Sequence, residues 1–336
     1  MTAVRDAAIG AEGLVRDFPA VRAVDGIDLA VERGQVFGFL GANGSGKTTT
    51  IRMLTTLLRP TAGRAYVDGL DVQREPSEVR RRIGVALQEA GLDDLQTGRE
   101  LLALQGRLHG VRRGEIDARV DELLAIVDLE DAADRRIGTY SGGMQRRLDL
   151  ASALVHRPAI VFLDEPTTGL DPISRDAVWR YVEQLNRDDG VTFFLTTQYL
   201  EEADRLADEV AIIDAGRIVA QGSPADLKAT IGADVVTIHV DAGADGTAVA
   251  RAVLRIEELD GLEEVRTLDE AIVVYIADGS RAIARLVTVV QDAGLDVREV
   301  TLAQPTLDDV FLRATGRHLE VDAEVPTTGA GEEESR

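Results

Sequence analysis

A glycine-rich segment with a single lysine is the part of this sequence with the clearest chemical potential. Residues 41–48 read Gly-Ala-Asn-Gly-Ser-Gly-Lys-Thr and fit the pattern G-x-x-x-x-G-K-[ST]. Glycines let such a loop turn tightly and direct backbone N–H groups at bound phosphates. An apolar run at 36–41 precedes the loop, and a helical stretch at 47–58 follows it. The positive end of that helix dipole would face the bound phosphates. The pattern predicts a nucleoside triphosphate site, although an ordinary glycine turn would use the same residues.

Two side chains of this loop have individual roles in the prediction. Lys47, one of only two lysines in the chain, is compact enough to lie between β- and γ-phosphate oxygens, where a forked guanidinium would not fit. Thr48 is expected to ligate Mg²⁺. The residues expected to bind ATP in this segment are Gly41, Ala42, Asn43, Gly44, Ser45, Gly46, Lys47, Thr48 and Thr49.

Two adjacent acids, Asp164 and Glu165, end the apolar run 159–165. An unpaired buried carboxylate is costly, so a buried strand that finishes in two acids needs a reason. A magnesium ion supplies one: Asp164 would hold the metal through water, and Glu165 would take a proton from an attacking water. The alternative is a strand that simply runs out into solvent.

A Ser-Gly-Gly triplet stands just before that strand, in the segment Tyr-Ser-Gly-Gly-Met-Gln-Arg-Arg at 140–147. Ser141 can cap a helix, and Gly142 and Gly143 allow an anion to approach the helix N-terminus. Alone, the triplet is an ordinary cap before an amphipathic helix reaching Arg157. Beside the phosphate loop and the acidic pair, it resembles the signature motif of ABC ATPases, and the resemblance covers about 1–228.

The resemblance implies a nucleotide site shared between two copies of the chain. In ABC ATPases, two nucleotide-binding domains pack head to tail, and the signature of one closes over the ATP of the other. A homodimer is therefore expected, with Ser141, Gly142 and Gly143 added to the ATP-binding residues.

Three further residues resemble functional positions of the family. Phe18 resembles the aromatic residue that stacks on adenine, although it could be an ordinary core aromatic. Gln88 resembles the glutamine that reaches Mg²⁺ and the attacking water. Asp171, in Gly-Leu-Asp, resembles the loop that contacts the partner across the dimer, and it could equally be a plain helix cap.

One position departs from the usual family pattern. The family usually has histidine in its switch, whereas the segment Thr-Thr-Gln-Tyr-Leu-Glu-Glu-Ala-Asp places Gln198 there. A glutamine amide can donate a hydrogen bond to a γ-phosphate but cannot carry a proton near neutral pH. The expected catalytic residues are Glu165 as the base, with Gln198 and Gln88 as positioning groups.

The switch variant and the segment 305–316, Pro-Thr-Leu-Asp-Asp-Val-Phe-Leu-Arg-Ala-Thr-Gly, together resemble the ATPase subunits of daunorubicin/doxorubicin resistance exporters. The resemblance implies an ATP hydrolase that drives a separate membrane permease for drugs or other hydrophobic compounds. The family docks its permease at about 89–112, where Arg107, Arg112 and Arg113 are contact candidates or a solvated basic face. The alternatives are a non-transport ABC ATPase and a catalytically weak regulatory protein.

The elements that must position these residues alternate in type. Apolar runs alternate with amphipathic stretches over 1–228, which favours an α/β fold. The expected strands are 36–41, 83–88, 159–165 and 191–197, the expected helices include 115–129 and one opened by Asp171, and a hairpin is expected at 209–222. The expected fold is a P-loop NTPase of the ABC type, with a helical subdomain at about 89–157.

A second, small α+β unit is expected at 234–316. Its pattern is strand 235–240, helix 247–259, strands 263–268 and 271–277, helix 280–293 and strand 296–302, the βαββαβ order of ferredoxin-like domains. Asp241, Asp245 and Asp269 are scattered acids expected in solvent, and the acidic tail 317–336 is expected to be disordered. The unit could regulate the first domain, support a dimer or simply pack on its neighbour.

Composition limits the partners. The 336 residues carry a net charge of −22, which disfavours nucleic acid and repels an anionic membrane surface. The absence of cysteine excludes disulfides and thiol catalysis. Neither a signal peptide nor a run of 18 apolar residues is seen, so we expect a cytoplasmic chain held on the membrane by its permease.

Overall fold

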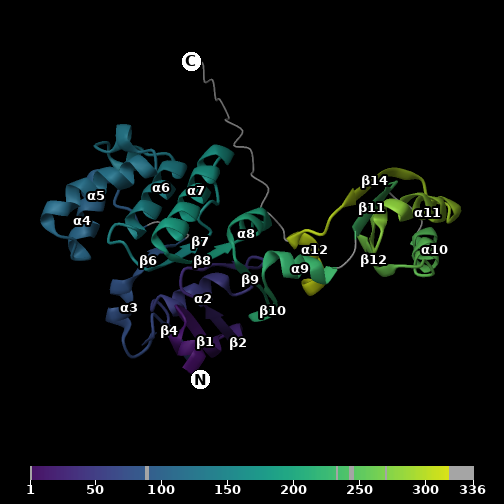
Figure 1. Ribbon diagram of the computed structural model, residues 1–336, viewed down its shortest axis with the longest axis horizontal. Helices are drawn as coiled ribbons and strands as arrows, with labels where there is room; N and C mark the ends of the chain where they lie inside the picture. The colour runs from purple at the N-terminus through teal and green to yellow at the C-terminus, as the bar shows by residue number, and fades with distance from the viewer. Residues whose placement is uncertain (1, 88–90, 232–233, 242–245, 269–270, 318–336) are drawn as a thin grey trace, which may run out of the picture.

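The structure is a computed structural model that describes residues 2–87, 91–231, 234–241, 246–268 and 271–317 (Figure 1). Gln88, Asp245, Asp269 and nearly all of the acidic tail lie outside the described residues.

A six-stranded sheet forms the centre of the first unit, in the order β10-β9-β3-β8-β7-β6. The strands are β3 Val36–Leu40, β6 Ile83–Ala86, β7 Ile160–Asp164, β8 Thr192–Thr197, β9 Glu209–Asp214 and β10 Arg217–Gly222. All neighbouring pairs are parallel except β9–β10, the predicted hairpin. Strands β3, β7 and β8 are buried along their whole length, because both faces of the sheet are covered.

A second, antiparallel sheet packs beside the first, in the order β2-β1-β4-β5. Its strands are β1 Ile9–Phe18, β2 Val21–Val31, β4 Ala62–Val67 and β5 Leu70–Asp71, and α1 Thr2–Asp6, α2 Lys47–Leu54 and α3 Pro76–Arg82 accompany them. One apolar cluster joins the two sheets, and it includes Ile9 of β1 together with Phe39 and Phe162 of the central sheet.

A group of helices, called the helical lobe here, packs on the face of the central sheet opposite the second sheet. Its members are α4 Gly98–Leu108, α5 Arg113–Ile126, η1 Glu130–Ala132, η2 Ile137–Thr139, α6 Gly142–Ala153 and α7 Pro172–Asp189. Thr97 begins α4 with a capping box that includes Glu100. The predicted helical subdomain, about 89–157, contains α4, α5 and α6 but not α7. Among the described residues, none of the helices is both long and apolar enough to span a bilayer.

Several predicted helices end earlier than expected, two of them by four residues. The helix predicted over 47–58 ends at Leu54, and Thr56 adopts a left-handed φ of 67°. The helix predicted through Arg157 ends at Ala153. Pro158 cannot donate a hydrogen bond to the Leu154 carbonyl, and the Arg119 guanidinium from α5 donates to it at 2.7 Å instead.

The C-terminal unit has the predicted βαββαβ order. It consists of β11 Asp234–Val240, α10 Gly246–Ile256, β12 Leu262–Leu268, β13 Ala271–Ile276, α11 Gly279–Asp292 and β14 Val297–Ala303. The strands form an antiparallel sheet in the order β12-β13-β11-β14, and α10 and α11 share one apolar cluster with it. Figure 1 places these two helices at the end of the molecule opposite α4 and α5.

Two helices join the units. α9 Pro224–Ile231 and α12 Leu307–Thr315 pack on each other, and α12 also packs on α8 Leu200–Leu206. The cluster they form includes Phe311 from α12 together with Leu40 and Ala203 from the first unit. The accessory sheet is therefore attached close to the helix that follows Gln198.

Candidate active site

Three neighbouring strands bring the predicted chemistry together. In the central sheet β8 lies between β3 and β7, with Leu40 opposite Thr197 and Asp164 opposite Thr196. The strands are parallel, so their carboxyl ends meet at one edge of the sheet. The glycine loop, the acidic pair and Gln198 each follow one of these ends, which is why segments distant in the sequence form one site.

Close packing explains the glycines of the loop. A Cβ on Gly41 would lie 2.5 Å from the Ile213 carbonyl oxygen, and one on Gly46 would lie 2.5 Å from the Ala23 carbonyl oxygen. Gly46 also has a φ of 114°, which side chains rarely tolerate. The loop is pressed against β9 and β2, while its apex at 43–44 is exposed. Its backbone is therefore held in shape with its outer side open to a ligand.

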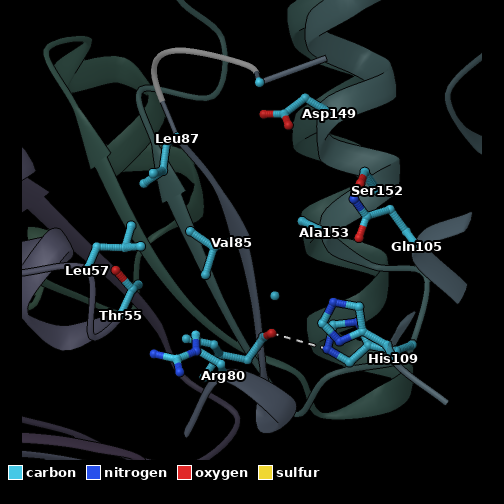
Figure 2. A pocket seen from close by; sticks show the side chains of 14 residues that line it. Thr55, Leu57, Arg80, Val85, Leu87, Gln105, His109, Asp149, Ser152 and Ala153 are labelled. Atoms are coloured by element: carbon cyan, nitrogen blue, oxygen red, sulfur yellow. Dashed lines mark hydrogen bonds between the residues drawn. The ribbon is translucent and has the colours of Figure 1, made fainter. Parts of the chain in front are cut away.

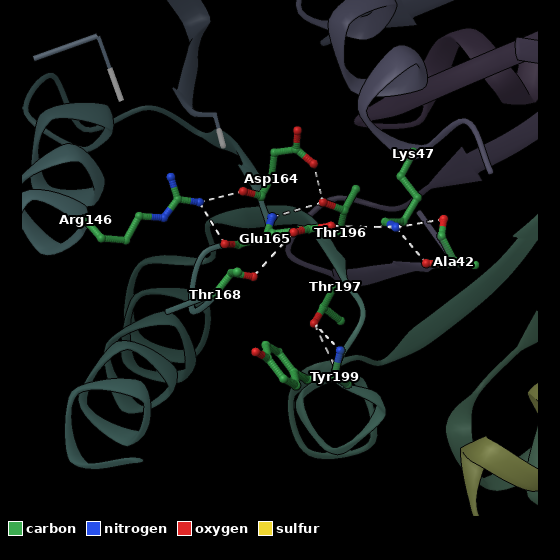
Figure 3. A network of polar contacts seen from close by, with 10 residues as sticks. Ala42, Lys47, Arg146, Asp164, Glu165, Thr168, Thr196, Thr197 and Tyr199 are labelled. Atoms are coloured by element: carbon green, nitrogen blue, oxygen red, sulfur yellow. Dashed lines mark hydrogen bonds and ion pairs between the residues drawn. The ribbon is translucent and has the colours of Figure 1, made fainter. Parts of the chain in front are cut away.

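Lys47 begins α2 and is buried, with 4% of its surface exposed. Its Nζ donates to the carbonyl oxygens of Gly41 at 2.6 Å and Ala42 at 3.2 Å, and lies 3.7 Å from Glu165 Oε1 (Figure 3). Burial lowers the pKa of Lys47, and the nearby charges of Glu165 and Asp164 oppose that change. The ammonium thus stands between the loop and the acidic pair. Thr48 and Thr49, the next two residues, are half-buried.

Asp164 has one satisfied and one unsatisfied oxygen. The Thr196 hydroxyl donates to Asp164 Oδ1 at 2.5 Å, and Oδ2 is buried without a hydrogen-bond partner among the described residues. A buried carboxylate oxygen without a partner is unfavourable, so the atom is suited to a cation or its bound water. Magnesium in nucleotide sites takes oxygen ligands and often only one or two carboxylates. Asp164 and the Thr48 hydroxyl fit that chemistry.

Glu165 is held in an unusual backbone conformation, with a φ of 51°. Its N–H donates to the backbone and hydroxyl oxygens of Thr196, both at 3.1 Å. The Thr168 hydroxyl lies 3.4 Å from Glu165 Oε2. Such strain persists only where the surroundings enforce it, and here it directs the carboxylate toward Lys47.

Gln198 is buried beyond the end of β8, with 4% of its surface exposed. Its Oε1 has no hydrogen-bond partner in the described part of the chain. The turn after it is fixed by the Thr197 hydroxyl, which accepts from the Tyr199 N–H at 2.8 Å. An amide placed in this way is available to a ligand at the sheet edge.

The signature segment lies at the tip of α6, in the helical lobe. Ser141 caps the helix, and its hydroxyl accepts from the Met144 N–H at 3.3 Å. Ser141 and Gly142 are exposed, and a Cβ on Gly142 would meet nothing within 4 Å. This helix N-terminus therefore opens to solvent, where an anion on another molecule could reach it.

The remaining predicted residues of the described chain, Phe18 and Asp171, make only local contacts in the structure. Phe18 ends β1 with 38% of its surface exposed, so it is not an ordinary core aromatic, and the Arg16 guanidinium stacks 4.6 Å from the centre of its ring. Asp171 caps α7 by accepting from the N–H groups of Ile173 and Ser174, each at 3.0 Å.

Arg146, in the signature segment, has a role that the sequence pattern did not indicate. Its guanidinium, from the second turn of α6, donates to the backbone oxygens of Asp164 at 2.5 Å and Glu165 at 2.9 Å, and also to that of Leu87. It thereby holds the acidic pair and the segment before Gln88 against the signature helix. No local pattern signals these contacts, because the i,i+3 spacing on α6 predicts only the ion pair of Arg146 with Asp149, at 3.4 Å.

A groove of about 350 Å³ lies where the helical lobe packs against β6 (Figure 2). Its lining includes Leu57, Leu87, Asp149 and the rings of His109 and His156, which stack with centroids 4.0 Å apart. Burial raises the pKa of Asp149 to about 6, and Arg146 opposes that change. Arg107, Arg112 and Arg113 are all exposed but do not line this groove, and Arg112 instead lines an adjoining cavity.

Comparison with known proteins agrees with this geometry. The family model described as "ABC transporter" matches residues 24–168, and that described as "ATP-binding protein DrrA1-3-like, C-terminal domain" matches 222–315. The chain is 47% identical to daunorubicin resistance ATP-binding protein DrrA2 of Streptomyces coeruleorubidus, over 93% of this chain and 96% of the relative. It is 39% identical to Nod factor export ATP-binding protein I of Paraburkholderia xenovorans, over 94% and 99%.

Among solved structures, the dimeric bacterial ABC transporter cassette MJ0796 is similar, with a TM-score of 0.61 and 25% identity, covering 64% of this chain and 98% of that one. Identity that extends over nearly the full length of both chains, together with the assembled sheet edge, places the protein in a family. The chain belongs to the ATP-binding subunits of ABC transporters, within the group of the daunorubicin resistance ATP-binding proteins, and it is an ATP hydrolase.

Proposed function

We propose that this chain powers an exporter as a homodimer, with each ATP bound between the glycine loop of one copy and the signature helix of the other. The proposal rests on one observation: within one chain, the two halves of the proposed ATP site lie on different parts of the first unit. The loop, the acidic pair and Gln198 meet at one sheet edge, whereas the Ser141 tip is exposed on the helical lobe. Residues 1–228 would form the motor and 234–316 an accessory domain.

Each group at the sheet edge has a role in this proposal. The loop N–H groups and Lys47 bind the phosphates, and Phe18 stacks on the adenine. Glu165 takes the proton of the attacking water, and Gln198 donates a hydrogen bond to the γ-phosphate. Thr48, Asp164 and Gln88 would hold Mg²⁺. When bound, that ion neutralises charge on the phosphate oxygens.

ATP binding and hydrolysis would close and open the dimer. A γ-phosphate in the loop recruits the partner's Ser141, Gly142 and Gly143, so two weak half-sites become one interface. Asp171, exposed at the start of α7, would contact the partner beside this interface. Loss of the γ-phosphate removes the bridging anion, and the interface opens. Opening and closing of this kind is what a coupled permease would use.

The groove beside β6 is the proposed permease contact. It adjoins Gly91 and includes Gln105 and His109, within the range 89–112. Its apolar wall and half-buried Asp149 suit an amphipathic segment that carries a hydrogen-bond donor. The chain would then be held at the cytoplasmic side of the membrane by the permease, rather than by lipid that its negative charge repels.

The cargo is proposed to be a drug or another hydrophobic compound. The names of the relatives refer to daunorubicin resistance and to Nod factor export, so they favour export over the two alternatives, a non-transport ATPase and a catalytically weak regulator. Lys47, Asp164 and Glu165 are all present at the sheet edge, which also argues against a loss of catalysis.

Glu165→Gln tests the shared site. The variant should bind ATP, lose at least about a hundredfold in turnover because its base is removed, and accumulate as a dimer. Size-exclusion chromatography with and without Mg-ATP measures the dimer, and phosphate release measures turnover.

The matched control is the double variant Glu165→Gln with Ser141→Arg. Ser141 is exposed, so the added arginine should leave the fold intact, retain ATP binding and prevent dimerisation. A Glu165→Gln protein that binds ATP but stays monomeric would contradict the shared site. If the double variant dimerises at the same ATP concentrations as the single variant Glu165→Gln, the proposed role of Ser141 is contradicted.

A further inference from the structure

One buried carboxylate near the site has no part in the mechanism described above. Glu202 lies on α8 with 1% of its surface exposed. It accepts a hydrogen bond from the Thr167 hydroxyl, and the Trp179 Nε1–H donates to the same oxygen at 3.2 Å. Its neighbour on the helix, Glu201, is exposed. Burying a carboxylate on this seven-residue helix costs free energy, and the hydrogen bonds that Glu202 accepts offset that cost.

The two donors come from different elements of the first unit. Thr167 follows Glu165 by two residues and is itself completely buried. Trp179 belongs to α7, the helix that Asp171 begins. Glu202 sits four residues after Gln198, on the helix that starts directly beyond the switch. A single carboxylate thus connects the switch helix, the segment of the proposed base and α7.

The surroundings show that the carboxylate needs these donors. Burial raises the pKa of Glu202 to about 7, and the hydrogen bond from Trp179 opposes that rise. Of the charged groups that face it, Arg175 on α7 lowers its pKa and Glu165 raises it. A second α7–α8 contact lies beside it, where Arg205 stacks 5.0 Å from the Trp179 ring and pairs with Asp176. The position is built to retain a hydrogen-bond acceptor.

We propose that Glu202 is a positioning residue that couples Gln198 to Glu165, because its carboxylate ties the switch helix to Thr167. The proposal rests on the roles proposed above for those two residues. With the tie in place, α8 cannot shift without moving the segment that carries the base. The base and the switch amide therefore reach the γ-phosphate and its attacking water together.

The test compares Glu202→Ala, Glu202→Gln and the control Glu201→Ala in the full chain. Glu202→Ala should lower kcat for ATP hydrolysis by about tenfold or more, while KM for ATP changes less than about twofold, because phosphate binding by the loop is untouched. Glu202→Gln should remain within about twofold of wild type, since its amide oxygen can still accept from Thr167 and Trp179. Glu201→Ala should match wild type.

A second variant tests the same contact in case Glu202→Ala does not fold. Thr167→Val removes only the hydroxyl and should lower kcat in the same way, and combining it with Glu202→Ala should cause less loss than the two separate losses multiplied. Wild-type kcat in Glu202→Ala, or losses that multiply fully, would overturn the proposal. Glu165→Gln is assayed in parallel: if it turns over normally, the proposed function itself fails, whereas if only Glu202→Ala is normal, the positioning role alone fails.

Discussion

At the scale of single residues, the site depends on atoms that the folded chain leaves unsatisfied. Asp164 Oδ2 and Gln198 Oε1 are both buried without hydrogen-bond partners among the described residues. Lys47, by contrast, is drawn onto the carbonyl oxygens of Gly41 and Ala42 and toward Glu165. Unsatisfied buried groups cost stability, and in the proposed function a bound cation would satisfy Asp164 Oδ2.

The amide of Gln198 gives the first residue-scale prediction. Gln198→Ala should lower kcat by about tenfold, less than Glu165→Gln does, because the loss of one positioning hydrogen bond is smaller than the loss of the base. Steady-state phosphate release measures both variants, with the exposed Gln291→Ala as a control. Equal losses in Gln198→Ala and Glu165→Gln would show that Gln198 does more than position.

At the scale of elements, the site exists because parallel strands end at one edge and glycines allow close contact. The strand order β3-β8-β7 brings three loops together, and Arg146 then fixes α6 to the end of β7. A similar close approach joins β6 to α6 below the site. There, a Cβ on Gly84 would lie only 2.1 Å from the Ala153 carbonyl oxygen.

Gly84→Ala should therefore separate β6 from α6 and destabilise the first unit by about 1–3 kcal/mol, the cost of overpacking a filled contact. Gly114→Ala is the matched control, because a Cβ there meets nothing within 4 Å and alanine favours the helix α5. Trp179 is the only tryptophan, so its fluorescence in a urea titration reports on this unit. An unchanged unfolding midpoint in Gly84→Ala would contradict the close contact.

At the scale of the whole molecule, one apolar cluster connects the accessory unit to the motor. Phe311 of α12 is fully buried in a cluster that also contains Ala203 of the switch helix and Leu40 at the end of β3. The Arg313 guanidinium donates to the Thr230 carbonyl oxygen at 2.7 Å and ties α12 to α9. The accessory unit thus supports the strand and helix that flank the site.

Phe311→Ala should weaken this connection by about 3–5 kcal/mol, the usual cost of removing a buried phenylalanine side chain. Amide hydrogen exchange should become faster in α12 and in α8, while α11, which belongs to the separate C-terminal cluster, stays protected. The exposed Leu254→Ala on α10 is the control. Unchanged exchange in α8 would show that the accessory unit does not support the switch helix.

By itself, the sequence determined the local chemistry. The loop at 41–48, the pair Asp164 and Glu165, and the βαββαβ order could all be predicted, because turn geometry, helix capping and alternating apolar patterns are set by neighbouring residues. Helix ends were less predictable: α6 stops at Ala153 partly because Arg119, from another helix, takes the next carbonyl oxygen.

Only the tertiary structure decided what lies beside what. The contacts of Arg146 with the acidic pair, of Glu202 with Thr167 and of Phe311 with the switch helix all join residues far apart in the chain. No local pattern encodes such contacts, because they form only when the strand order and the packing of separate helices bring the side chains together.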